Sequence, residues 1–208
     1  MAAVDAVVFD LGNVLIEWDP HPAIAAGVGA DEASRFLTAT DFDFGSWNHQ
    51  QDSGTPWVDA ELAVEKSHPH WHRHATAYRQ HFHRSLLGAI PGTVDILREL
   101  HAAGTAVYGL TNWSAELFPV ARESYAFLDL FDDIVVSGEE GVAKPDPGIF
   151  DVLRERVGRP LDACLFVDDN PANVDAARTA GMDAIVFTGP VALRAELASR
   201  DLLGAIDG

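Results

Sequence analysis

The feature that most constrains the fold is a series of short, almost wholly apolar segments that recur along the chain. Segments of this kind are typical of strands covered on both faces of a parallel sheet. Helical patterns lie between them, with Pro or Asp near their starts and Gly near their ends. This alternation predicts an α/β fold, a doubly wound, Rossmann-like parallel sheet with right-handed crossovers. The expected strands are 4–9, 105–110, 133–136, 163–167 and 183–187, and the expected helices are 92–103, 146–157 and 171–180.

The stretch from residue 17 to residue 88 interrupts this alternation. It contains no convincing strand, and we expect it to form a helical cap, 17–88, inserted after the first strand. The α/β core then consists of 1–16 and 89–208. The ends of the cap, near Glu17 and Gly88, would act as hinges over the sheet. Helices are expected in the cap at about 31–40, 57–66 and 71–86.

Composition narrows the classes of partner. Fourteen basic and thirty-two acidic residues give a net charge of −18, which would repel nucleic acid and anionic membranes. No apolar run approaches the roughly 20 residues that cross a bilayer, and the first residues lack the basic region of a secretory signal. The single Cys164 excludes an internal disulfide, so we expect a cytoplasmic protein. A monomer and a homodimer both remain open.

Polar side chains follow several of the expected strands at the point where each strand ends. In open α/β sheets a ligand lies outside the carboxyl ends of the strands, so these side chains should meet at one edge. A lysine in the loop ahead of the helix at 146–157 joins them. The converging residues are Asp10, Thr111, Asn112, Lys144, Asp168 and Asp169.

These residue types suit phosphoryl transfer. Carboxylates brought together favour a hard divalent cation such as Mg²⁺, which takes oxygen ligands. One carboxylate can also act as a nucleophile, which divides a hard displacement into two easier ones. The transferring group needs its charge neutralised by a metal, a lysine and short donors. Lys144 is one of only two lysines, with Lys66, and its compact ammonium fits between a carboxylate and a phosphate.

Four ordered segments resemble the motifs of the haloacid dehalogenase (HAD) superfamily. Together they cover nearly the whole core, about 4–16 and 90–188, and the helical insert resembles the small helical cap of that superfamily. The first segment, in its FDLGNV form, is similar to a subgroup of sugar-phosphate phosphatases with a capped fold. The segments are VVFDLGNVLI, YGLTNWS, GVAKPDPGIF and CLFVDDNPANVDAARTAGM.

The resemblance implies a role for each matching residue. Asp10 would be the nucleophile, and Thr111 would bind the transferring phosphoryl group. Lys144 would hold the nucleophile and the substrate in register. Asp168 would bind Mg²⁺ together with Asp10, and Asp169 would support the metal shell directly or through water.

One position departs from the superfamily pattern. Phosphatases of this type usually carry a second Asp two residues after the nucleophile as general acid and base, and here that residue is Gly12. The metal site survives, because the family uses a main-chain oxygen there. The proton for the leaving group would come from Glu17, Asp19, a cap histidine or water. Asn112, next to Thr111, would add an amide donor for the substrate.

The cap contains several tryptophans and a histidine-rich segment. Trp57 and Trp71 are interpreted as anchors of a small core, whereas Trp47 is a candidate to lie over a sugar ring of the substrate. Six of the nine histidines fall between residues 68 and 83. His70 and His74 share a helix face at a spacing that can hold a metal. Because neither Cys nor an HExxH pattern accompanies them, a solvated helix is favoured over a zinc site.

The sequence therefore predicts an Mg²⁺-dependent phosphatase. It would hydrolyse a small phosphorylated metabolite, with sugar phosphates among the candidates, through an aspartyl-phosphate on Asp10. One alternative is a 2-haloacid dehalogenase, which uses the same nucleophile without a metal. Dehalogenases usually have an aromatic residue in place of Gly12 and a less acidic fourth motif, so Asp168 and Asp169 favour the phosphatase. The other alternative is a non-enzymatic binding protein on a degenerate fold of this superfamily.

Overall fold

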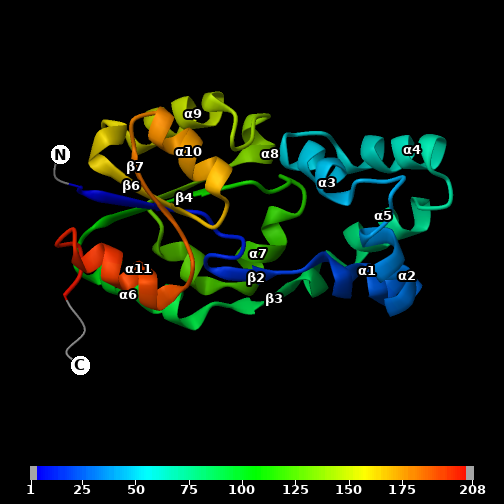
Figure 1. The fold of residues 1–208 in the computed structure, drawn as a ribbon, viewed down its shortest axis with the longest axis horizontal. Coiled ribbons are helices and arrows are strands. Elements are labelled where there is room, and N and C mark those ends of the chain that lie inside the picture. Colours follow the sequence, from blue (N-terminus) through cyan, green and yellow to red (C-terminus); the bar gives the residue numbers. More distant parts are fainter. Residues whose placement is uncertain (1–3, 205–208) are drawn as a thin grey trace.

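A computed structural model of the protein describes residues 4–204. Its main sheet has five parallel strands in the order β5-β4-β1-β6-β7 (Figure 1). The chain leaves β1 toward β4 and β5 on one side and later returns to β6 and β7 on the other. The carboxyl end of β1 is therefore the point where a doubly wound sheet binds its ligand. The strands are β1 (Ala6–Phe9), β4 (Ala106–Thr111), β5 (Asp133–Val136), β6 (Cys164–Asp168) and β7 (Asp183–Val186).

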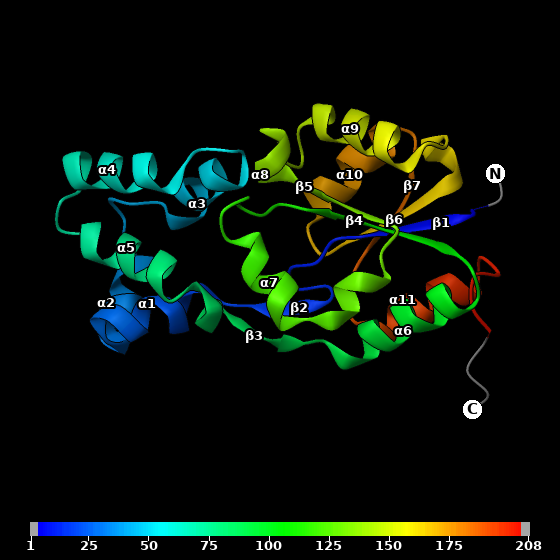
Figure 2. The ribbon, with the colours of Figure 1, turned by 180° about the vertical axis from the view of Figure 1, so that it is seen from behind.

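Helices cover both faces of this sheet (Figure 2). Val7 and Phe9 on β1 belong to one buried cluster with residues of α6 and α11, and Ala6 and Val8 belong to another with residues of α9 and α10. All four side chains are fully buried, which explains why this segment is apolar without alternation. The helices are α6 (Pro91–Ala102), α9 (Pro147–Val157), α10 (Pro171–Thr179) and α11 (Pro190–Ala198).

The core elements expected from the sequence are confirmed to within one or two residues. Asp146 caps α9 by accepting a hydrogen bond from the backbone of Gly148, and Gly158 ends that helix at φ 66°. Asn170 caps α10 in the same way. The sequence reading missed α11 and two shorter helices in the core. These are α7 (Phe118–Ser124) and α8 (Ser137–Glu140), and short 3-10 helices lie at Ala126–Leu130 and Leu161–Ala163.

Five helices between β1 and α6 lie together at one end of the molecule (Figure 1). Two short strands join them to the core as an antiparallel pair, in which Glu17 lies opposite Gly88. The expectation of no strand in this stretch was therefore wrong, because strands this short carry little sequence signal. The elements are β2 (Ile16–Trp18), α1 (Pro20–Val28), α2 (Ala30–Leu37), α3 (Phe44–Asp52), α4 (Trp57–Ser67), α5 (His72–Gln80), a 3-10 helix (Phe82–Ser85) and β3 (Leu86–Ala89).

Aromatic side chains form the interior of this helical part. Trp57 is 1% exposed, and its ring centroid lies 5.4 Å from that of Trp47 and 5.7 Å from that of Tyr78. Trp71 is also buried, as expected for an anchor. This aromatic cluster is continuous with the buried residues on one face of the main sheet. Among the described helices, none has the length and apolar character needed to cross a bilayer.

Candidate active site

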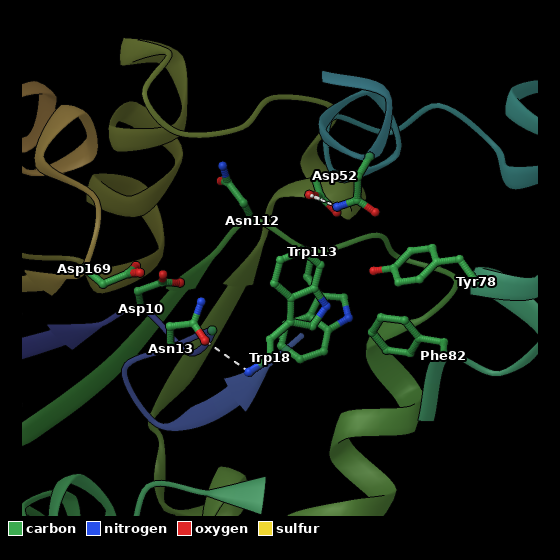
Figure 3. A pocket seen from close by; sticks show the side chains of 11 residues that line it. Asp10, Asn13, Trp18, Asp52, Tyr78, Phe82, Asn112, Trp113 and Asp169 are labelled. Carbon is green, nitrogen blue, oxygen red and sulfur yellow. Dashed lines mark hydrogen bonds between the residues drawn. The ribbon is translucent and has the colours of Figure 1, made fainter. Parts of the chain in front are cut away.

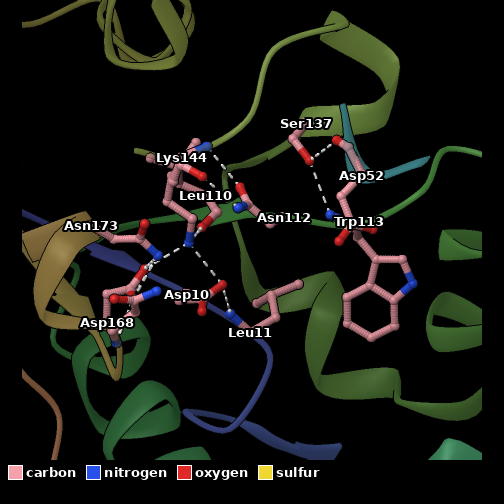
Figure 4. Close-up of polar contacts among 11 residues, drawn as sticks. Asp10, Leu11, Asp52, Leu110, Asn112, Trp113, Ser137, Lys144, Asp168 and Asn173 are labelled. Carbon is pink, nitrogen blue, oxygen red and sulfur yellow. Dashed lines mark hydrogen bonds and ion pairs between the residues drawn. The ribbon is translucent and has the colours of Figure 1, made fainter. Parts of the chain in front are cut away.

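Two carboxylates and one lysine meet at the carboxyl end of β1. Asp10 follows β1 directly, and Asp168 is the last residue of the neighbouring strand β6. The Lys144 ammonium lies between them, 3.0 Å from Asp10 Oδ1 and 2.7 Å from Asp168 Oδ2 (Figure 4). It also donates to the backbone oxygen of Leu110 at 2.7 Å. Lys144 is 1% exposed, so its charge is balanced within the protein rather than by water.

Side-chain amides hold this group in place. Both ends of the Asn112 amide bind the backbone of Lys144 at 2.8 Å, the nitrogen donating and the oxygen accepting. Asn173 donates to Asp168, which also accepts from the backbone of Asn170. The two bonds to Lys144 give Asn112 a structural role, while its expected role as an amide donor to the substrate stays a prediction. Its oxygen and one N–H serve to fix the lysine loop.

The electrostatics of the site reflect burial. Burial raises the pKa of the Asp10 carboxyl, Lys144 opposes this effect, and the charges of Asp168 and Asp169 add to it. Burial alone would lower the pKa of Lys144. The two neighbouring carboxylates raise it by more, so the pKa of Lys144 lies above its usual value. The pKa of Asp169 is also raised, by burial and by the charge of Asp168. A positive charge brought to these carboxylates would favour their ionised forms.

The donor set fits a hard divalent cation. Asp10, Asp168 and Asp169 each offer a carboxylate oxygen, and the three oxygens lie within 4.8 Å of one another. Oxygen ligands at this spacing match the preference of Mg²⁺. Asp169 is exposed, which leaves one side of the cluster open to water and substrate. Gly12 lines the same space, beside Asp10.

A cavity of about 190 Å³ opens beside these carboxylates (Figure 3). Asp10 and Asp169 form its floor at the sheet, and residues from the helical part form the opposite wall. Figure 3 shows Asp52 and Tyr78 on that wall, facing the space in front of Trp113. The lining consists of Asp10, Gly12, Asn13, Trp18, Asn48, Asp52, Tyr78, Phe82, Asn112, Trp113 and Asp169.

Asp52, the last residue of α3, brings a further carboxyl group to the cavity. Asn48, one helical turn earlier, donates to its Oδ2 at 3.0 Å. Burial raises the pKa of Asp52 to about 7, the backbone of Ser114 lowers it in part, and the charge of Asp10 raises it further. No sequence motif pointed to this residue. No helix was expected from the sequence at 44–52, so Asp52 lay in a stretch without an assigned element.

Hydrogen bonds near Asp52 join the helical part to the core. The Trp57 indole donates to Ser114 Oγ at 2.7 Å, and its backbone N–H donates to Glu116 at 2.9 Å. Ser137 donates to the backbone oxygen of Asp52. These contacts hold Asp52 at the cavity.

Several residues singled out from the sequence do not line the cavity. Thr111 ends β4 and is 1% exposed, while its neighbour Asn112 reaches the lining. Trp47 packs among the aromatic rings of the helical part, so the structure does not place it over a substrate. Glu17 is exposed on β2, and Asp19 caps α1 by accepting from a backbone N–H. Within residues 4–204, no histidine belongs to the lining.

Sequence comparison places the chain among phosphatase-related proteins. A family model for haloacid dehalogenase-like hydrolases matches residues 4–181. A sesquiterpene phosphatase from Aspergillus oryzae is 29% identical over 200 residues, which cover 96% of each chain. A phosphoglycolate phosphatase from Cereibacter sphaeroides is 27% identical over 191 residues, which cover 88% of this chain and 84% of that protein.

Solved structures share the fold. A HAD family enzyme from Bacteroides thetaiotaomicron, solved with magnesium and inorganic phosphate, matches with a TM-score of 0.68 and 20% identity over 89% of this chain and 95% of that one. A HAD family hydrolase from Deinococcus radiodurans, solved with phosphate and sodium, gives a TM-score of 0.66 and 20% identity over 98% of this chain and 99% of that one. At this level of identity the likeness shows the α/β fold with its helical elements.

Proposed function

Because this chain belongs to the haloacid dehalogenase-like hydrolase family, we propose that it is a magnesium-dependent phosphatase that acts on small phosphate monoesters through an aspartyl-phosphate on Asp10. The observation that carries the proposal is the position of Lys144 between Asp168 and Asp10, the residue of this group that lines the cavity. The phosphatases among the relatives support the same class of reaction.

In the proposed first step, Asp10 attacks phosphorus. Its Oδ1 accepts from Lys144 and from the backbone of Leu11, which leaves Oδ2 free to form the new bond. The bond between phosphorus and the alcohol oxygen breaks, and the alcohol leaves with the electron pair and takes up a proton from water. Lys144 keeps the nucleophile oriented. Thr111, at the end of β4, is proposed to bind the phosphoryl group.

The second step returns the enzyme to its starting state. Water attacks the phosphorus of the aspartyl-phosphate, the Asp10 carboxylate leaves, and inorganic phosphate is released. Mg²⁺ held by Asp10, Asp168 and Asp169, with the main-chain oxygen of Gly12, would neutralise charge on the transferring group.

We propose that residues 17–88 act as a cap over a core made of 1–16 and 89–208. The antiparallel pair β2–β3 is then the connection at which the cap would move, since both chain crossings lie in it. Opening would admit the substrate, and closure would exclude bulk water during phosphoryl transfer.

A phosphate-release assay tests the proposal. p-Nitrophenyl phosphate and a panel of sugar phosphates are assayed with Mg²⁺ and with EDTA, and release is expected only with Mg²⁺. Asp10→Asn should lower kcat by about 10³-fold or more, because it removes the nucleophile. Asp59→Asn, an exposed residue on α4, is the matched control and should leave kcat unchanged.

Two outcomes would contradict the proposal. Phosphate release that persists in EDTA and in purified Asp10→Asn would exclude the nucleophile assigned here. Halide release from 2-chloropropionate, without phosphate release from any ester, would establish the dehalogenase alternative instead. The acidic pair Asp168 and Asp169 argues against that result, because a halide leaves without metal assistance.

A further inference from the structure

The wall of the cavity opposite Asp10 carries a carboxyl group and no cationic group. Its polar groups are the amide of Asn48, the hydroxyl of Tyr78 and the carboxyl of Asp52. No Arg, Lys or His belongs to the lining within residues 4–204, and Asp52 takes part in none of the ion pairs found there. The nearby Lys144 is already held by two carboxylates. A second anionic group on a substrate would therefore find no cationic partner.

We infer that the enzyme selects small phosphate esters whose alcohol portion carries no negative charge, and that Asp52 rejects anionic alcohols. The inference rests on the proposed phosphatase function and adds the class of leaving group to it. Asp10 fixes where the phosphoryl group binds, so the alcohol portion must extend toward the opposite wall, on which Asp52 lies.

The position of Asp52 is well defined. Asn48 holds one of its carboxylate oxygens from within α3, and the Ser114 backbone interacts with it from the core side. Ser137 anchors its backbone oxygen. To turn away from an anionic substrate, this carboxylate would have to break its partly buried hydrogen bond with Asn48. Repulsion between charges that are partly shielded from water is also stronger than in water.

The remaining lining indicates which alcohols fit. Trp18, Tyr78, Phe82 and Trp113 supply aromatic surface that suits apolar or cationic groups. The cavity of about 190 Å³ is smaller than the ~300–1,000 Å³ of ordinary ligand pockets, which favours a short alcohol. This chain should therefore differ from its phosphoglycolate phosphatase relative, whose named substrate carries a carboxylate.

Three esters of nearly equal size test the charge of the alcohol portion. Phosphoglycolate carries a carboxylate, 2-hydroxyethyl phosphate is neutral at that end, and phosphoethanolamine carries an ammonium. Measured at pH 8 with saturating Mg²⁺, kcat/KM should be at least tenfold lower for phosphoglycolate than for the neutral ester, about 1.4 kcal/mol. The ammonium ester should be at least as good a substrate as the neutral one.

Asp52→Asn keeps the shape of the side chain and removes its charge. It should bring the ratio of kcat/KM between the neutral and the anionic ester close to one, mainly by raising kcat/KM for phosphoglycolate. Asp59→Asn removes the same charge from the exposed face of α4 and should leave the ratio unchanged. Circular dichroism spectra of both variants verify that they fold, and the wild-type ranking tests the inference without any variant.

The outcomes separate this inference from the proposed function. If no ester, including p-nitrophenyl phosphate, is hydrolysed, the proposed function fails. If esters are hydrolysed but phosphoglycolate equals or exceeds the neutral ester, the inference is overturned and the phosphatase function stands. In Asp52→Asn, kcat/KM could instead fall equally for all three alkyl esters and stay unchanged for p-nitrophenyl phosphate. This result would make Asp52 a proton donor rather than a charge selector and would also overturn the inference.

Discussion

At the scale of single residues, the site concentrates charges that a folded protein otherwise avoids burying. Lys144 and Asp168 are fully enclosed, and burial raises the pKa of Asp10 in spite of its contact with the ammonium. Asp52 adds another carboxyl group across the cavity. Such charges cost folding free energy and are concentrated at functional sites. Their cost should be measurable in the free energy of unfolding.

Asp52→Asn should change how stability depends on pH. Burial raises the pKa of Asp52 from 3.8 to about 7 in the folded protein, so the native state binds this proton more tightly than the unfolded state does. The wild type therefore loses stability between about pH 4 and pH 7, by about 1.4 kcal/mol per pH unit, whereas the variant lacks this loss. Urea unfolding in EDTA should show the variant gaining about 2 kcal/mol relative to wild type from pH 5 to pH 7.

The comparison needs the same two pH values for both proteins, because titrating groups that do not interact with Asp52 then cancel in the difference. A difference between variant and wild type that stays constant from pH 5 to pH 7 would show that Asp52 is not held in an unfavourable environment. It would also weaken the argument that its charge is partly shielded from water.

At the scale of elements, the site depends on how α3 and the start of α4 dock on the loop at Ser114 and on the start of α8. The Trp57 indole donates a hydrogen bond to Ser114, and the Ser137 hydroxyl donates one to the backbone oxygen of Asp52. Gly138 permits close approach within the core, since a Cβ there would lie 2.4 Å from the backbone nitrogen of Ala115. The charge-selecting wall is therefore built by contacts between segments far apart in the sequence.

Ser114→Ala tests this docking. The substitution leaves the Trp57 indole N–H buried without an acceptor, which should lower the free energy of unfolding by about 1–3 kcal/mol. Urea unfolding measures the effect. Ser124→Ala is the matched control, because its hydroxyl is exposed and bonds only within α7, and it should stay within about 0.5 kcal/mol of wild type. Equal stability of the two variants would show that the Trp57 bond does not fasten the helical part.

The same elements show what the sequence could and could not predict. Buried parallel strands need apolar residues on both faces, so β1 and β6 were recognisable, and Asp10 and Asp168 followed from the ends of those strands. Asp52 could not be recognised, because its role depends on the docking of α3. The interior position of Trp47 was hidden for the same reason: local spacing does not tell an inward-facing aromatic residue from one that faces a ligand.

At the scale of the whole molecule, one continuous buried cluster links the helical part to one face of the sheet. Folding of the two parts should therefore be coupled. Binding of a ligand at the carboxyl ends of the strands should then change the stability of both parts. The net charge of −18 lowers the stability of the folded chain, since repulsion between like charges destabilises the compact state. A bound divalent cation would relieve repulsion where carboxylates are closest together.

Mg²⁺ should consequently stabilise the whole chain in a single transition. At a concentration one hundred times its Kd, a ligand that binds only the folded state adds about 2.7 kcal/mol, which for a chain of this size raises Tm by about 5–10 °C. Thermal unfolding followed by circular dichroism, in EDTA and in MgCl₂, measures the shift. Asp169→Asn should reduce it, because Asp169 belongs to the carboxylate cluster, whereas Asp59→Asn should preserve it. A shift of equal size in both variants would place the cation elsewhere on this acidic protein, and a helical part that melts separately would contradict the coupling.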